Sequence, residues 1–135
     1  MRGLAWVLVP ALALAVANCA ARSRPPASPG RLESHVGLAT YYGQRFDGKV
    51  TASGARFDMN AMVAAHPTYP FGTIVRVTNL RNNRSVQVRI LDRGPGPGPR
   101  AEGTLIDLSY GAARALDFIQ AGRTRVRLEV VRWGN

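Results

Sequence analysis

The feature that most constrains the fold is an alternating strand that ends in a carboxylate, directly before a tight Gly-Pro loop. Val86, Val88 and Ile90 fall on one face of this strand, with polar residues between them. Continuing the same period of two places Asp92 on the apolar face, at the end of the strand. A segment of this kind predicts a half-buried β-strand with an acid at the mouth of the core.

Two interpretations of Asp92 follow from this position. A carboxyl group at the mouth of a core loses hydration, and desolvation raises the pKa of an acid toward the range of a useful proton donor. The alternative is an aspartate that forms the turn before Gly94-Pro95, because aspartate is common in turns. Arg93 is adjacent but points to the opposite face, so adjacency does not make it the partner of Asp92.

The N-terminus predicts export. Arg2 precedes an apolar run over residues 4–17, which is too short to span a bilayer and resembles the core of a signal peptide. We therefore expect residues 1–18 to be a removed signal peptide and the protein to lie in a bacterial envelope, periplasmic or anchored in the membrane. Cys19 directly follows and is either the lipidated cysteine of a lipoprotein or incidental.

Behind the signal sequence, composition divides the chain into a linker and one domain. Residues 19–35 are rich in Arg, Pro, Ser and Ala and predict a flexible linker. Residues 36–135 suffice for one domain with one core. Because the chain holds 1 cysteine, it cannot form an internal disulfide.

The charge is strongly basic, with 18 Lys and Arg against 8 Asp and Glu, a formal net charge of +10. Such a balance often indicates nucleic-acid binding, but export and the lack of a nucleic-acid motif argue against that partner. We expect an anionic partner in the envelope, such as cell-wall polymer or lipid head groups, or else a solvated basic surface. A monomer is expected.

Patterning predicts a mainly β domain that closes into a small barrel. A helix is expected across residues 110–118, with Ser109 as its N-cap and Gly122 as its stop signal. Glu129 is expected to face outward with its neighbouring arginines. The predicted strands cover residues 36–42, 73–79, 85–91 and 124–132, and the two middle strands form a hairpin through a turn at residues 81–84.

Seven short motifs in fixed order carry a resemblance to a known family. They are Tyr41-Tyr42-Gly43, Thr51-Ala52-Ser53-Gly54, Ala64-Ala65-His66, Phe71-Gly72-Thr73, Val77-Thr78-Asn79-Leu80, Asp92-Arg93-Gly94-Pro95 and Ile106-Asp107-Leu108-Ser109. The sequence resembles the rare lipoprotein A family of septal-ring lytic transglycosylases. This resemblance implies a six-stranded double-psi β-barrel with one or two short helices, as in expansins.

The resemblance also implies roles for individual residues. Asp92 matches the catalytic acid/base, and His66 matches a histidine of the same groove. The positions matched to substrate contacts are Tyr41, Tyr42, Thr51, Ser53, Arg93 and Asp107. Structural alternatives remain open: His66 as a packed loop residue, Asp107 as a carboxylate at a helix start, and the tyrosines as core residues.

The sequence departs from the family pattern near the expected site. Ala55 stands where the family has a glutamate that is thought to assist the aspartate. The loop after Asp92 is longer than usual and rich in Gly-Pro, and Thr104 stands where the family has an arginine. Arg100 or Arg93 is the candidate replacement.

Two functions follow from the resemblance. A lytic transglycosylase cleaves between N-acetylmuramic acid and N-acetylglucosamine and leaves a 1,6-anhydro end, which one acid can achieve without attacking water. No cofactor is needed, and two histidines without a CxxC motif predict no metal site. The alternative is a non-catalytic, expansin-like barrel that binds peptidoglycan glycan strands.

Overall fold

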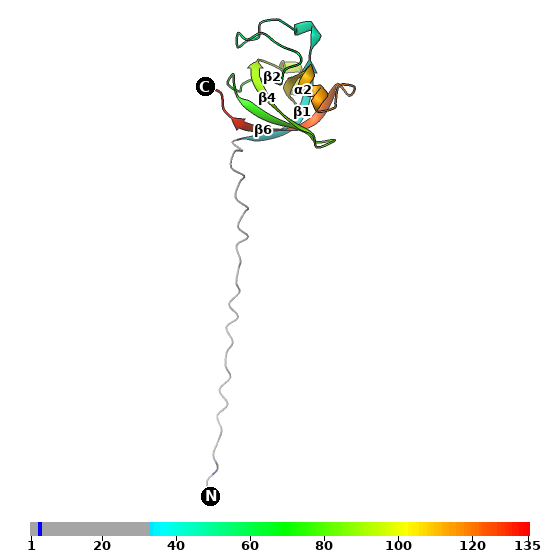
Figure 1. Cartoon of the computed structure of the whole chain (residues 1–135). Coiled ribbons are helices and arrows are strands. Elements are labelled where there is room, and N and C mark those ends of the chain that lie inside the picture. The colour runs from blue at the N-terminus through cyan, green and yellow to red at the C-terminus, as the bar shows by residue number, and fades with distance from the viewer. Residues whose placement is uncertain (1–2, 4–32) are drawn as a thin grey trace.

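The computed structural model describes Gly3 and residues 33–135. The predicted signal peptide, Cys19 and most of the predicted linker lie outside these residues. The described strands close into one barrel in the order β1-β5-β2-β4-β3-β6 (Figure 1). They are β1 (Ser34–Tyr42), β2 (Val63–Ala65), β3 (Ile74–Asn79), β4 (Ser85–Asp92), β5 (Thr104–Ser109) and β6 (Arg123–Arg132).

The predicted hairpin is confirmed. β3 and β4 pair antiparallel with Val77 opposite Val86, and Asn83 takes the positive φ of 64° that the connecting turn requires. Valines that alternate along these strands fill the inside of the barrel, and β6 adds Val126, Leu128 and Val130. Each such fully buried side chain contributes about 1.5–3 kcal/mol to stability.

Helix α2 (Tyr110–Ala115) begins where predicted. Ser109 caps it, because its Oγ accepts a hydrogen bond from the Ala112 backbone N at 3.2 Å. The helix is shorter than predicted, and Asp117, at φ 58°, follows its last turn. Gly122 lies in the turn before β6, so its predicted role as the stop signal is wrong.

Several elements were not predicted by patterning. Strands β2 and β5, the short helix α1 (Pro97–Ala101) and the 3₁₀ turn η1 (Gln44–Phe46) belong to this group. Asp107 lies inside β5, which rules out the helix-start interpretation of this residue. Glu129 is on the outward row of β6, as predicted, and is nevertheless only 4% exposed. Within residues 33–135, no helix is long and apolar enough to cross a membrane.

Candidate active site on the outer face of the barrel

Two aspartates meet on the outside of the barrel because one short strand lies between them. Ala65 of β2 pairs with Asp92 of β4 on one side and with Asp107 of β5 on the other. Residues paired across neighbouring strands share a face of the sheet, so the two carboxyl groups flank the Ala65 methyl group. A small residue at this position leaves space between the two acids.

An irregularity in the β2–β4 register brings Asp92 to this face. Ala64 pairs with Ile90, but Ala65 pairs with Asp92, so Leu91 is an extra residue in β4. Ile90 is fully buried in the core, and strict alternation would have directed Asp92 inward as well. The prediction that Asp92 continues the core-facing row is therefore wrong, and the bulge is the reason.

The two acids line a small open cleft of about 180 Å³. We call it the acid cleft; its lining residues are Tyr42, Phe46, Ala65, Asp92, Arg93 and Asp107. The volume is below the roughly 300 Å³ at the lower end of small-molecule sites, so the cleft fits a reacting group rather than a whole ligand.

The surroundings of Asp107 in the acid cleft shift the pKa of its carboxyl group. Burial raises the pKa of the Asp107 carboxyl, and the negative charge of Asp92 raises it further, while a hydrogen bond from Thr40 Oγ1 to Asp107 Oδ1 opposes this. Gly94 closes the same side at φ 141°, and a Cβ there would lie 3.2 Å from Asp107 Oδ2. The cleft thus holds a carboxyl group that keeps its proton more readily than usual, next to a second acid.

Asp92 is held by backbone groups. Its Oδ1 accepts hydrogen bonds from the N–H groups of Ala52 at 3.0 Å and Arg93 at 2.9 Å. Both bonds end on Oδ1, and among the described residues no hydrogen bond is made to Oδ2, which leaves this oxygen for a ligand. Because both donors are backbone groups, the carboxylate is oriented without a charged partner.

The loop that binds Asp92 contains Thr51 and Ser53. Thr51 Oγ1 lies 2.9 Å from Ser53 Oγ and donates to the Ala55 carbonyl at 2.7 Å. The Ser53 N–H donates to the Leu91 carbonyl at 3.1 Å. These two residues, expected as substrate contacts, shape the loop that presents an N–H to Asp92. Ala55 lies in the same turn, three residues after the Ala52 N–H that binds Asp92.

Tyr42 and Tyr41 have different environments although they are neighbours. The buried Tyr42 hydroxyl has no hydrogen-bond partner among the described residues, while its ring stacks on Phe57 at a centroid distance of 4.4 Å. Burial, followed by the charges of Asp92 and Asp107, raises the pKa of Tyr42, so the hydroxyl stays a donor. The Tyr41 hydroxyl donates to the Ile119 carbonyl at 2.8 Å, and its ring packs against the core.

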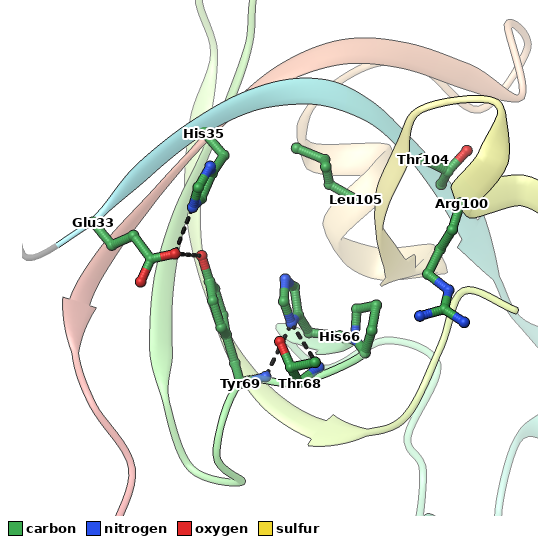
Figure 2. Close-up of a pocket in the computed structure, with 9 residues that line it drawn as sticks. Glu33, His35, His66, Thr68, Tyr69, Arg100, Thr104 and Leu105 are labelled. Carbon is green, nitrogen blue, oxygen red and sulfur yellow. Dashed lines mark hydrogen bonds and ion pairs between the residues drawn. The ribbon is translucent and has the colours of Figure 1, made fainter. Parts of the chain in front are cut away.

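His66 is hydrogen-bonded to Asp92 through the backbone, and its ring makes no hydrogen bond to Asp92. The His66 N–H donates to the Asp92 carbonyl at 3.1 Å. The ring Nδ1 accepts from the N–H groups of Thr68 at 3.2 Å and Tyr69 at 3.0 Å, and the ring stacks on Tyr69 with centroids 3.6 Å apart (Figure 2). Burial, followed by the positive charge of Arg93, lowers the pKa of His66 to about 4.

The His66 ring lines a second cavity of about 300 Å³, which we call the side pocket. Its lining residues are Glu33, His35, His66, Pro67, Thr68, Tyr69, Arg100, Thr104 and Leu105. Arg100, one of the two candidate replacements for the family arginine at position 104, lines the same pocket as Thr104.

Arg93, the other candidate, is engaged by the loop after β2. Its Nη1 donates to the carbonyls of Tyr69 at 2.8 Å and His66 at 3.2 Å, and its guanidinium lies 3.9 Å from the Phe71 ring centroid. These contacts hold the Arg93 side chain to the loop after β2, whereas its backbone N–H binds Asp92. Within residues 33–135, no group of three or more His, Cys, Asp or Glu could hold a metal ion.

A closed six-stranded barrel with mixed pairing and this acid cleft is a double-psi β-barrel of the expansin type. An expansin of Clavibacter michiganensis has a TM-score of 0.58 and 25% identity, over 76% of this chain and 52% of that chain. A Streptomyces papain inhibitor has a TM-score of 0.59 and 26% identity, over 76% and 97%.

Residues 34–128 match the model of the lytic transglycolase family, and the chain belongs to this family. A relative from Campylobacter jejuni, an endolytic peptidoglycan transglycosylase RlpA, is 48% identical over 103 residues, which cover 76% of this chain and 36% of the relative. The chain spans about a third of the length of the curated relatives that it matches.

Proposed function

We propose that this protein is an endolytic peptidoglycan lytic transglycosylase of the cell envelope. It cleaves the bond between N-acetylmuramic acid and N-acetylglucosamine and leaves a 1,6-anhydromuramoyl end. The observation that carries the proposal is the juxtaposition of Asp92 and Asp107 across Ala65, with a raised pKa at Asp107. The family and the relatives support the substrate class.

The two acids supply both proton transfers. A protonated carboxyl of the pair donates its proton to the glycosidic oxygen as the bond to the muramoyl C1 breaks. The ionised carboxylate accepts the proton of the muramoyl C6 hydroxyl as that oxygen forms a bond to C1. The reaction needs no water, metal or redox partner, and the pair ends with one proton, as it began. We assign Asp92 direct contact with the substrate, because its Oδ2 is free of protein bonds among the described residues.

A non-catalytic, glycan-binding barrel is the second candidate. Ala55 favours it, because this residue lies in the turn that orients Asp92 and supplies no third carboxylate there. The two candidates differ in whether 1,6-anhydromuramoyl ends are produced. They do not differ in whether peptidoglycan is bound.

Digestion of purified sacculi, with mass spectrometry of anhydromuramoyl ends, separates the two candidates. Asp92→Asn and Asp107→Asn should each reduce end formation by at least about a hundredfold, since each removes one proton-transfer partner. Asp117→Asn is the matched control, because this exposed aspartate has φ 58°, which asparagine tolerates. A folded wild-type protein that binds sacculi and forms no anhydro ends would establish the binding function instead.

Export and anchoring belong to the same proposal. Residues 1–18 are a removed signal peptide, and lipidated Cys19 holds the domain close to the membrane through the linker that follows. Mass spectrometry of the mature N-terminus tests this: a diacylglyceryl group on Cys19 supports anchoring, and an intact Met1 contradicts export.

A further inference from the structure

Arginines from β4, β3 and β6 share one outer face of the barrel. Arg76 of β3 pairs with Glu129 of β6. Ile74 of β3 pairs with Arg89 of β4 on one side and with Arg132 of β6 on the other. Residues paired across neighbouring strands share a face, and so do alternate residues along one strand. We call this surface the arginine face; its cations are Arg76, Arg89, Arg125, Arg127 and Arg132.

The protein leaves most of this positive charge uncompensated. Within residues 33–135, the guanidinium groups of the arginine face make no hydrogen bond or ion pair. All of these side chains are exposed except that of Arg127, which is half-buried. Of the described outward residues of β3, β6 and β4 as far as Arg89, Glu129 is the one acid, and it is 4% exposed. The face therefore presents a net positive charge to any partner.

Exposed apolar side chains accompany the arginines. Val36 of β1 pairs with Arg127 and is 47% exposed. Trp133 is 37% exposed and lines a cavity of about 310 Å³ together with Arg89 and Arg132. Cations beside exposed tryptophan and aliphatic side chains are typical of a surface that rests in the head-group layer of a membrane.

The arginine face lies on the side of the barrel away from the acid cleft. In the closed strand order, β2 is three strands away from β6 in either direction. Figure 1 shows β2 and β6 on opposite sides of the barrel. Ala65 of β2 lies between the two acids of the cleft. A flat surface that covers β6 therefore leaves the acid cleft open on the far side.

The first strand begins on the arginine face. Ser34, the first residue of β1, pairs with Glu129 in the middle of this face. Cys19 precedes Glu33 by 14 residues, and a coil of that length has a root-mean-square span of about 20 Å. An anchor at Cys19 would therefore hold the arginine face, and not the acid cleft, toward the membrane.

We propose that the arginine face docks on the anionic head groups of a lipid bilayer. The guanidinium groups bind lipid phosphates, and Trp133 and Val36 enter the head-group layer. Cations spread over three strands match an extended layer of phosphates better than a single small anion. Docking in this direction turns the acid cleft away from the membrane. The docking goes beyond the proposed function and does not depend on its chemistry.

The fluorescence of Trp133 tests the docking, because this residue is the one tryptophan of residues 19–135. The sample is the mature chain, residues 19–135, kept reduced and without lipid on Cys19, so that no anchor contributes to binding. Vesicles of phosphatidylglycerol and phosphatidylcholine in equal parts should bind it, with a blue shift of the emission and quenching by acyl chains brominated near the head group. Vesicles of phosphatidylcholine alone should not bind it.

Arg89→Gln/Arg125→Gln removes two exposed charges of the arginine face. Each arginine near an anionic surface raises the partition constant about fivefold, so this variant should bind about 25-fold more weakly. Arg89→Lys/Arg125→Lys keeps the charge and should still bind. The matched control is Arg45→Gln/Lys49→Gln, which removes two charges that lie 5.8 and 5.9 Å from the ring centroid of Phe46, at the acid cleft. These charges are more than a Debye length of about 8 Å from the docked surface, so the control should change binding less than about twofold.

Three results overturn the docking: no binding of the wild type to the phosphatidylglycerol vesicles, an equal loss of binding in Arg89→Gln/Arg125→Gln and in the control, or binding without a change in Trp133 emission. The first result, together with weaker binding of Arg89→Gln/Arg125→Gln to purified sacculi, would assign the arginine face to cell-wall polymer. Failure of the wild type to form anhydro ends overturns the proposed function alone, because the vesicles contain no glycan.

Discussion

The unpartnered hydroxyl of Tyr42 makes an unusual prediction: its removal should stabilise the free protein. A buried hydroxyl without a hydrogen bond costs about 1–3 kcal/mol of desolvation. Tyr42→Phe deletes that group and keeps the ring that stacks on Phe57. Because the residue as a whole is only half-buried, we expect the lower end, a gain of about 1 kcal/mol in the free energy of unfolding. For a domain of this size that raises Tm by roughly 4–8 °C.

Tyr41→Phe is the internal control, because it makes the same chemical change one residue earlier. The Tyr41 hydroxyl donates to the Ile119 carbonyl at 2.8 Å, so its loss leaves that carbonyl without this donor. Stability should fall by about 1 kcal/mol. Neighbouring tyrosines should therefore respond to one substitution with opposite signs.

Urea unfolding of the wild type and both variants at neutral pH measures these signs. The formation of anhydromuramoyl ends by the same three proteins measures the effect on activity. The stabilised Tyr42→Phe protein should keep activity close to that of the wild type, since the buried hydroxyl has no accessible surface to offer a ligand and the ring that lines the acid cleft is retained. If Tyr42→Phe destabilises the protein as Tyr41→Phe does, the hydroxyl has a partner in the folded state and the reasoning is wrong.

The other predictions concern the groups around the two cavities. A raised pKa means that Asp107 contributes stability at low pH that is lost as pH rises through its folded pKa. Asp107→Asn should therefore be more stable than wild type at pH 7, and urea titrations should show this advantage vanishing as the pH falls below the ordinary aspartate range. The lowered pKa of His66, about 4 against 6.5, means that stability falls as pH drops below 6.5 and levels off near 4. After allowance for partial exposure the change is about 1–2 kcal/mol, and a His66→Gln unfolding curve that keeps the full wild-type pH slope would contradict it. Gly94→Ala should lower activity at least tenfold and stability by about 1–2 kcal/mol, because φ is 141° and the new Cβ would lie 3.2 Å from Asp107 Oδ2; an unchanged kcat/KM on sacculi would show that the carboxyl is not constrained from this side.

The alternation of apolar residues predicted those strands and turns whose positions are set by neighbouring residues. The β3–β4 hairpin and the inward row of β6 follow from strict alternation of apolar residues, and the capping of α2 follows from one serine. Strands β2 and β5 were not predicted as strands. β2 has only 3 residues, too few to show alternation, and both strands pair with partners far away in the sequence. Their position depends on long-range pairing that no local window contains.

The candidate residues of the site were named from the sequence, but their arrangement was not. Asp92 and Asp107 were both candidates, yet alternation placed Asp92 inside, because Leu91 is as apolar as a regular strand residue and leaves no trace of the bulge. His66 was expected beside the acid, and its ring instead turns toward two backbone N–H groups of its own loop. The direction of a loop side chain depends on such neighbours, and they become known only with the fold.

The bulge at Leu91 makes the acid pair depend on one extra residue. If β4 alternated regularly through Leu91, the carboxylate of Asp92 would turn toward the sealed interior and Leu91 would take its place on the outer surface. Removal of Leu91 would instead give a regular strand in which Asp92 directly follows Ile90 and stays opposite Ala65. A related barrel could therefore keep its acid pair without the bulge by losing this one residue, independently of every residue that holds the core together.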